Sequence, residues 1–349
     1  MRARAQAMLR TEGRKEGLNR VATPAGQGQR GGMSSLRPLA AALWSRAYIL
    51  LAMTALFWAG NSIVGRAARD LVPPVALSFW RWTFALLLLL PLAWPHLKRD
   101  WPVLRRHWPV MLALGMMGIG AFNTLLYTGL QDTTAINAML IQAGQPPLIL
   151  LVGVLAMKDR THAAQIAGVL VSLIGVLVVI ARGDLASLLA LRLNGGDAII
   201  AVAVVIWACY SVLLRRRPPV HPLSFLAASM MIGLAVIAPF YAAELSSGRA
   251  IVPGWRSGMA IAYVSIFPSF LAYLFFNRGV ELIGSTATGH FMNMMPLMGA
   301  GLAMLFLGER LHLFHIAGLA LVVGGLLIAT RAAPAPGIAA EGARPPGGA

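Results

Sequence analysis

The sequence has little charge and almost no cysteine. Only 12% of its 349 residues are charged, against about 25% in a typical soluble domain. The single cysteine, Cys209, excludes an intrachain disulfide and a multi-cysteine metal site. The twelve acidic residues are scattered, and no nucleotide-binding glycine loop, HExxH or GxSxG motif occurs. The sequence therefore predicts no catalytic residues, no cofactor and no metal site.

Hydrophobic residues dominate the composition instead. They make up 58% of the chain, and the mean hydropathy is +0.71. A bilayer core of about 30 Å needs about 20 mostly apolar residues per helix. Apolar runs of about this length occupy residues 47–66, 74–95, 108–129, 134–157, 163–181, 196–214, 222–243, 257–277, 282–307 and 312–330. The pattern predicts an all-α integral membrane protein with ten transmembrane helices and the lipid bilayer as its main solvent.

Basic residues dominate the charge that is present, with a formal net charge of +17. Such an excess can indicate nucleic-acid binding. However, nine of the 29 Lys and Arg residues lie between residues 2 and 46, and most others lie in short gaps between apolar runs. With the N-terminus inside, twelve later basic residues face the cytoplasm and seven face the opposite side. We therefore expect no nucleic-acid partner, and a multi-pass protein of the cell (inner) membrane with both termini cytoplasmic.

The two ends of the chain lack a hydrophobic core. Residues 1–46 are basic and contain no apolar segment of the kind found in signal peptides. The stretch before Met33 is rich in Arg, Gly and Gln, which leaves Met1 and Met33 as alternative starts. Residues 332–349 are rich in Pro and Gly. We expect 1–46 to be a disordered cytoplasmic tail and 332–349 a second disordered tail.

The two halves of the chain resemble each other. An offset of 150 aligns residues 127–182 with 277–332 and matches glycine, proline, arginine and histidine as well as aliphatic residues. The matched pairs include Gly129 with Gly279, Pro146 with Pro296, Arg160 with Arg310, His162 with His312, Gly168 with Gly318 and Gly175 with Gly325. Two repeats of five spans, 47–182 and 196–331, would enter the membrane from opposite sides. Inverted repeats of this kind are a recurring plan of secondary transporters that work by alternating access.

Several short segments resemble the EamA transporters of the drug/metabolite transporter superfamily over about residues 47–331. They include Phe57 to Asn61, Phe79 to Arg81, Tyr127 to Ala135, Gly196-Asp197, Trp207 with Tyr210, Tyr273, Pro296, and Leu307 to Arg310. The first repeat departs from the family pattern at Lys158 to Arg160, and His290 and Asn293 are not expected from it. The resemblance implies export of amino acids, other small metabolites or drugs, driven by ion or substrate gradients.

Arg81 is the one basic residue well inside an expected span. A charge at the bilayer centre costs about 2.5–3.5 kcal/mol on insertion scales, so an arginine there usually faces a cavity or a partner. The alternative is that its long side chain reaches the lipid headgroups. One deep cation favours a neutral, zwitterionic or hydrophobic small-molecule substrate over a nucleotide sugar or phosphate ester.

Other polar and aromatic residues within the apolar runs complete the predicted site. Spacing of three places Trp58 and Asn61 on one helix face, and Trp207 and Tyr210 likewise. The predicted substrate-binding residues are Trp58, Asn61, Arg81, Asn137, Gln142, Gln145, Trp207, Tyr210, Tyr273, His290 and Asn293. Each could instead serve helix packing and interhelical hydrogen bonding. His290 is also a candidate for coupling a proton to transport.

Two further hypotheses compete with transport. A non-transporting membrane sensor or scaffold would usually carry a soluble output domain, and a membrane-embedded enzyme would need catalytic groups. The turns at Asp159 and Glu309 are expected to fix helix ends. Substrate identity, coupling ion, direction and oligomeric state do not follow from the sequence.

Overall fold

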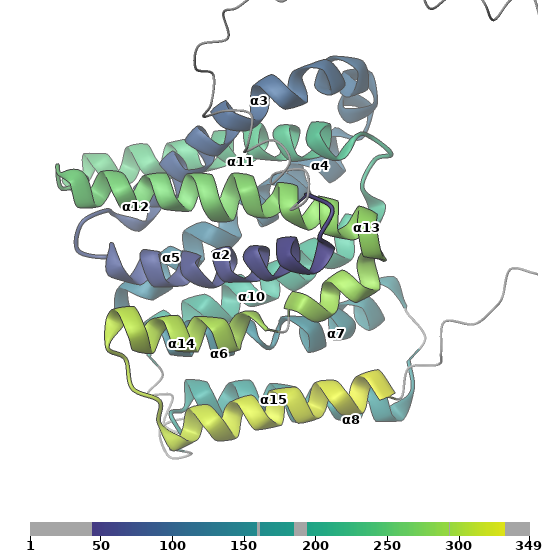
Figure 1. The fold of residues 1–349 in the computed structure, drawn as a ribbon, viewed down its shortest axis with the longest axis vertical. Helices are drawn as coiled ribbons and strands as arrows, with labels where there is room; N and C mark the ends of the chain where they lie inside the picture. Colours follow the sequence, from purple (N-terminus) through teal and green to yellow (C-terminus); the bar gives the residue numbers. More distant parts are fainter. Residues whose placement is uncertain (1–43, 159–160, 185–193, 293, 332–349) are drawn as a thin grey trace, which may run out of the picture. The chain divides into compact units, whose positions relative to one another are not determined.

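The computed structural model describes residues 44–158, 161–184, 194–292 and 294–331, without the side chains of 285–287, 289, 290, 292, 330 and 331. The chain separates into two units, residues 1–45 and 46–349. Every element described below belongs to the second unit (Figure 1).

All regular secondary structure of the described residues is helical. In chain order the elements are α2 (Ala47–Ala67), α3 (Pro74–Arg106), α4 (Trp108–Leu114), η1 (Gly115–Ala121), α5 (Phe122–Asp132), α6 (Ala135–Gln142), α7 (Gln145–Met157), α8 (Ala163–Ile180), α10 (Gly195–Leu213), η2 (Leu214–Arg216), α11 (Pro222–Ser246), α12 (Trp255–Ser265), η3 (Ile266–Leu271), α13 (Ala272–Met292), α14 (Met295–Leu307) and α15 (Leu313–Arg331). Segments η1 and η3 are π-helical and continue the α-helices on either side, whereas η2 is a single 3-10 turn.

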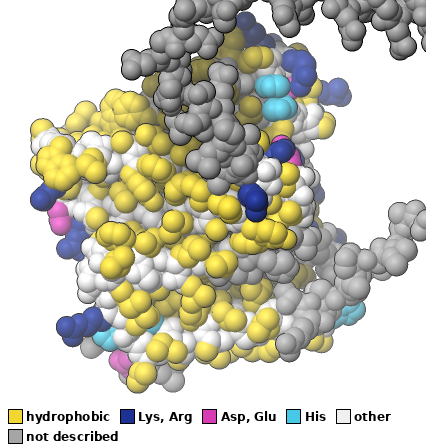
Figure 2. Space-filling view, viewed as in Figure 1, with side chains coloured by type: hydrophobic (Ala, Val, Ile, Leu, Met, Phe, Trp, Pro, Cys, Tyr) yellow, Lys and Arg dark blue, Asp and Glu magenta, His cyan; other side chains and the backbone are white. Residues whose placement is uncertain are grey.

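The described helices have the dimensions of a membrane protein. Eight helical stretches are long and apolar enough to cross a bilayer, and two shorter apolar helices, Met295–Leu307 and Leu313–Ala329, accompany them. Figure 2 shows hydrophobic side chains over the middle of the visible face and most of the charged ones towards two opposite edges. The structure confirms an all-helical chain suited to a membrane, while the count of ten spans stays a prediction.

The structure corrects two predicted boundaries. The eighth apolar run was expected to end at residue 277 and the ninth to begin at 282, but the helix continues through this segment to a kink at Gly284. The second apolar run was expected to end at residue 95, but α3 continues to Arg106 through the charged segment Lys98 to Asp100. Lysine and arginine are good helix formers, and Asp100 accepts hydrogen bonds from the start of α11. Charge at the end of a span therefore does not end the helix.

Proline and glycine interrupt the fourth and ninth apolar runs. Helix α6 ends at Gln142, and α7 begins at Gln145 with Pro146 in its first turn. Helix α14 begins in the same way, with Pro296 following Met295. The two prolines thus lie just after breaks in the helices of two equivalent runs. A further kink lies at Gly284, whose positive φ of 82° an L-residue rarely adopts.

Close glycine contacts hold α8 and α15 side by side (Figure 1). A Cβ on Gly168 would lie 2.6 Å from the backbone nitrogen of Ala329, and one on Gly175 would lie 2.6 Å from the carbonyl of Gly318. Between these contacts the Ser172 hydroxyl donates to the Val322 carbonyl at 3.0 Å. Small residues allow such close backbone approach, which is how helices associate in lipid.

Candidate functional site

Arg81 is the centre of a buried polar network that joins four elements. It keeps only 2% of its surface exposed. Its Nη1 donates to Asn61 Oδ1 on α2 at 2.8 Å and to two groups on α5, Asn123 Oδ1 and the Tyr127 hydroxyl, each at 2.7 Å. Its Nε donates to Ser269 Oγ on η3. The Tyr127 hydroxyl donates in turn to Asn61 Oδ1 at 2.5 Å. The structure thus brings together two predicted site residues, Asn61 and Arg81.

Aromatic rings surround this network. The Arg81 guanidinium carbon lies 4.6 Å from the centroid of the Trp82 ring, within range of a cation–π interaction. The Tyr273 ring contacts the rings of both Trp82 and Trp58, with centroid distances of 6.4 and 5.7 Å. Trp58 Nε1 donates to the Pro268 carbonyl at 3.0 Å. Two further predicted residues, Trp58 and Tyr273, therefore lie beside Arg81.

The two π-helical segments position groups at the site. A π-turn adds a residue to a helix and leaves carbonyls free for other donors, and such turns are frequent at functional sites. Segment η3 supplies Ser269 and the Pro268 carbonyl. In η1, Gly118 lies against the Tyr210 ring so closely that a Cβ would approach Tyr210 Cε2 to 2.6 Å. Only glycine leaves room for that tyrosine.

Trp207 and Tyr210 form an aromatic group on α10. Trp207 lies 4.7 Å from the ring of Phe122 and 5.0 Å from that of Tyr210, centroid to centroid. Tyr210 and Tyr273 both pack against the apolar cluster that contains Trp82. The spacing of three does place Trp207 and Tyr210 together, although neither makes a direct hydrogen bond with Arg81.

The glutamines of the fourth apolar run occupy different surroundings. Gln142, at the end of α6, is buried and donates to Ser62 Oγ at 3.5 Å and to the Ala138 carbonyl at 3.1 Å. Ser62 is the neighbour of Asn61, so Gln142 lies next to the network. Gln145 is half-buried at the start of α7.

Asn137 belongs to a second buried cluster, separate from the Arg81 network. Its amide donates to both carboxylate oxygens of Asp197, at 3.3 and 3.2 Å, and its Oδ1 accepts from His315 Nε2 at 2.9 Å. Thr133 also donates to Asp197, and His315 Nδ1 accepts the backbone N–H of His312 at 3.0 Å. These bonds occupy the polar atoms of Asn137 and tie α6 to α10 and α15. The contacts give Asn137 a role in fixing helix ends.

Carboxylates cap the first turns of other helices. Glu309 accepts the N–H groups of Ala135 and Ile136 at 2.8 and 2.9 Å, which confirms that its turn fixes a helix end. Glu244 on α11 accepts the Val75 and Ala76 N–H groups at 3.3 and 2.8 Å. A carboxylate at a helix N-terminus accepts hydrogen bonds from the free N–H groups and is stabilised by the positive end of the helix dipole. Asp159, the counterpart of Glu309 in the sequence, lies outside the described residues.

A stacked histidine pair lies where α11 begins. The His221 N–H and the Ser224 hydroxyl donate to Asp100 Oδ2, at 2.9 and 2.8 Å. The rings of His96 and His221 stack with centroids 3.7 Å apart. Burial, and then the positive charge of His96, lower the pKa of His221 below its ordinary value near 6.5.

Two predicted residues of the ninth apolar run cannot be placed. The side chain of His290 and the whole of Asn293 lie outside the described residues, so a role in substrate or proton binding stays a prediction for both. Within the described part of the chain, no group of three or more His, Cys, Asp or Glu residues has the geometry of a metal site.

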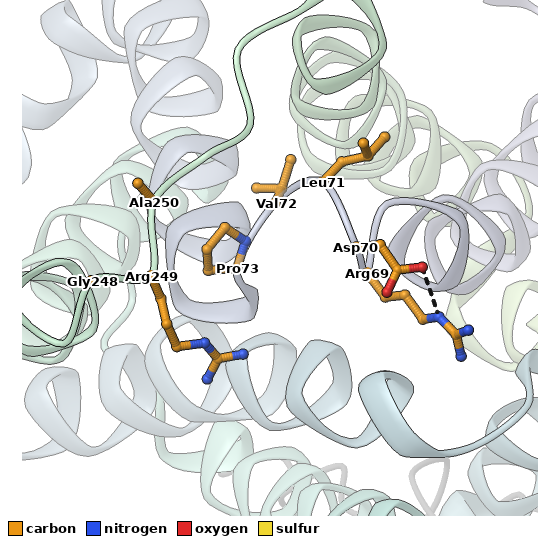
Figure 3. A pocket seen from close by; sticks show the side chains of 8 residues that line it. All are labelled: Arg69, Asp70, Leu71, Val72, Pro73, Gly248, Arg249 and Ala250. Carbon is orange, nitrogen blue, oxygen red and sulfur yellow. Dashed lines mark hydrogen bonds and ion pairs between the residues drawn. The ribbon is translucent and has the colours of Figure 1, made fainter.

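One hollow on the surface lies away from this network. It has a volume of about 220 Å³ and is lined by Arg69, Asp70, Leu71, Val72, Pro73, Gly248, Arg249 and Ala250. Figure 3 shows Arg249 and Arg69 on opposite sides of the hollow, with Arg69 held by Asp70 at 3.2 Å. These loops share no residue with the Arg81 network. We take the network as the candidate site because several buried polar groups converge there.

Three residues of the network did not appear in the predicted site. Asn123, Tyr127 and Ser269 all bond to Arg81. Asn123 and Tyr127 are four residues apart in an apolar run, so they share a helix face, and that spacing was a usable signal. Ser269 has no such signal, because its direction depends on the π-turn of η3.

Comparison with known proteins matches this chain to transporters over most of its length. The model of the EamA-like transporter family matches residues 45–181 and again 194–331. "Uncharacterized transporter YyaM" of Bacillus subtilis (strain 168) is 30% identical over 81% of this chain and 93% of its own. "Inner membrane protein YtfF" of Escherichia coli (strain K12) is 26% identical over 82% of this chain and 95% of its own. A solved crystal structure at 22% identity covers 82% of this chain and 96% of its own with a TM-score of 0.55, which shows a similar fold. The family and the names of the relatives point to a membrane transporter without enzymatic activity, and this chain belongs to the EamA-like transporter family.

Proposed function

We propose that this protein is a secondary transporter that exports small metabolites, amino acids or drugs by alternating access. One observation carries the proposal: Arg81 in the segment 47–182 bonds to Ser269 in the segment 196–331. A buried cation held between the two halves of the chain is the arrangement expected where two units rock around a central site.

Contacts between the halves follow the offset of 150 residues. Gly168 lies against Gly325, and Gly175 lies against Gly318. The counterpart of Gly168 in the other half is Gly318, and that of Gly325 is Gly175, so the offset relates the first contact to the second. Ser172 bonds to Val322, its own counterpart. A two-fold axis in the membrane plane would produce this pattern, and these contacts support our proposal of two inverted five-helix repeats.

Helices α3 and α11 contribute a second reciprocal relation. Glu244 near the end of α11 binds the first turn of α3, and Asp100 near the end of α3 binds the first turn of α11. The two helices therefore run antiparallel, each with a carboxylate at the start of the other. Under our proposal they occupy equivalent places in the two repeats.

We place the protein in the cell (inner) membrane with both termini in the cytoplasm. The excess of basic residues in the N-terminal tail favours this orientation. The relative named "Inner membrane protein YtfF" supports the location. The expected partners are a small-molecule substrate, the bilayer and a coupling proton.

An efflux screen tests the function. The protein would be expressed in a host lacking its own exporters and challenged with toxic levels of amino acids, metabolites and drugs. We expect resistance to one compound class, which Arg81→Ala and Asn61→Ala abolish without preventing membrane insertion. Arg66→Gln is the matched control, because the hydrogen bonds of Arg66 to described residues go to the carbonyls of Leu130 and Gln131 at the end of α5. Absence of resistance to any compound, with well-inserted protein, would favour a sensor or scaffold.

A further inference from the structure

Two buried N–H donors beside each other in the sequence lack acceptors. All hydrogen bonds of Arg81 to described residues use Nε and Nη1, so Nη2 is left without one. Trp82 is fully buried, and its Nε1 has no hydrogen-bond partner among the described residues. Buried polar groups are nearly always hydrogen-bonded, so each orphan calls for an explanation.

The two residues are also in contact through their side chains. The centroid of the Trp82 ring lies 4.6 Å from the guanidinium carbon of Arg81. The free Nη2 and the free indole N–H therefore belong to one small region. A carboxylate has two acceptor oxygen atoms, one for each of these donors.

The charge of Arg81 has no counter-ion among the described residues. Its four hydrogen-bond partners, Asn61, Asn123, Tyr127 and Ser269, are neutral. The buried acids are used elsewhere, since Asp100 and Glu244 each bind a helix start and Asp197 binds the side chains of Thr133 and Asn137. A buried charge is costly unless it is paired. A ligand with one negative charge would balance the charge of Arg81.

The surroundings limit the rest of the ligand. Trp82 lies against the guanidinium, Tyr273 contacts Trp82, and Trp58 contacts Tyr273. Among the described residues, no second cation takes part in the network. A single positive charge suits a carboxylate better than a group of two or more negative charges. Flat apolar walls suit a small apolar body.

We propose that Arg81 Nη2 and Trp82 Nε1 bind the carboxylate of the exported substrate, which is a small monocarboxylate or a zwitterionic amino acid. The inference rests on the proposed function, because the ligand is the molecule that is transported. Arg81 supplies charge, and Trp82 supplies a fixed neutral donor. These two donors would then allow the protein to distinguish a carboxylate ligand from the corresponding amide.

Matched ligand pairs test the proposal on the purified full chain in lipid nanodiscs. The probes are butyrate, phenylacetate and leucine, each compared with its amide, and sodium chloride alone. The melting temperature is followed for each as a function of concentration. We expect at least one carboxylate to stabilise the wild type while its amide and chloride do not. Trp82→Phe keeps an aromatic side chain but removes the N–H together with part of the indole ring, so it should weaken binding of that carboxylate roughly tenfold or more.

Two variants separate binding from folding. Arg81→Gln should abolish the stabilisation by the carboxylate, and Arg66→Gln should leave it unchanged. If Arg81→Gln fails to fold, Trp82→Phe alone decides. Equal stabilisation by a carboxylate and its amide, stabilisation by chloride alone, or no loss in Trp82→Phe would overturn the inference.

The efflux screen separates failure of the carboxylate site from failure of the proposed transport function. Export of cationic or neutral compounds with no carboxylate among the substrates would overturn the carboxylate site and leave the transporter intact. No export of any compound, together with no stabilisation by any probe, would overturn both.

Discussion

The neighbouring residues Gly324 and Gly325 on α15 provide a test of how closely α8 and α15 pack. A Cβ on Gly325 would lie 2.6 Å from the backbone nitrogen of Ser172 on α8, whereas a Cβ on Gly324 would meet nothing within 4 Å. Carbon atoms pack at about 3.5–4.0 Å, so Gly325→Ala must push α8 and α15 apart by roughly 1 Å. That shift also stretches the bond from Ser172 Oγ to the Val322 carbonyl, now 3.0 Å long.

The expected cost follows from the backbone nature of the contact. Backbone atoms cannot rotate away as a side chain does, and overpacking of this kind costs about 1–3 kcal/mol. Gly324→Ala should change the free energy of unfolding by no more than about 0.5 kcal/mol. Gly175→Ala, which faces the Gly318 carbonyl at 2.6 Å, should behave like Gly325→Ala.

Thermal melting in one detergent measures the difference. Gly325→Ala and Gly175→Ala should melt several degrees below the wild type, and Gly324→Ala should melt with it. Equal melting temperatures for Gly324→Ala and Gly325→Ala would refute the close packing of α8 on α15.

Three further predictions concern other parts of the molecule. Glu309→Ala leaves two N–H groups of α6 without their carboxylate and should lower stability by about 1–2 kcal/mol in a melting experiment, whereas Glu281→Ala, on an exposed side chain, should change it by less than about 0.5 kcal/mol. Because the folded state lowers the pKa of His221, the unfolded chain takes up a proton first as pH falls, so stability should drop below about pH 6.5. His221→Asn should flatten melting temperature between about pH 5 and 8, and an unchanged slope would count against this cause. Asn123→Ala removes an acceptor of Arg81 and should slow the initial efflux rate roughly tenfold, and an unchanged rate would remove Asn123 from the site.

The sequence predicted the features that depend on hydrophobicity, and it missed those that depend on local backbone geometry. Arg81 and Asn61 stood out because polar groups inside apolar runs need partners, and the structure joins them at 2.8 Å. Asn137 stood out for the same reason, but its partner is Asp197 at a helix end. The sequence alone does not tell a residue of the Arg81 network from one at a helix end, because either position provides hydrogen-bond partners for a buried amide.

The unpredicted parts have identifiable physical causes. The π-turns η1 and η3 carry no hydrophobic signal, because they occur within continuous apolar runs. The direction of Ser269 therefore could not be derived from periodicity. Helix α3 passed through Lys98 to Asp100 because charged residues are helix formers that water or a neighbouring helix start can satisfy.

Accessibility of Ser269 from both sides of the membrane tests the central claim most directly. Ser269→Cys would be made in a Cys209→Ser background, which leaves one thiol in the chain. A membrane-impermeant thiol reagent would be applied to intact cells and to inside-out vesicles, with Leu305→Cys, which is 76% exposed on the apolar surface, as control. Alternating access around the Arg81 network predicts labelling of Ser269→Cys from either side and none of the control. Labelling from only one side, or from neither, would contradict a central site that opens in turn to both faces of the membrane.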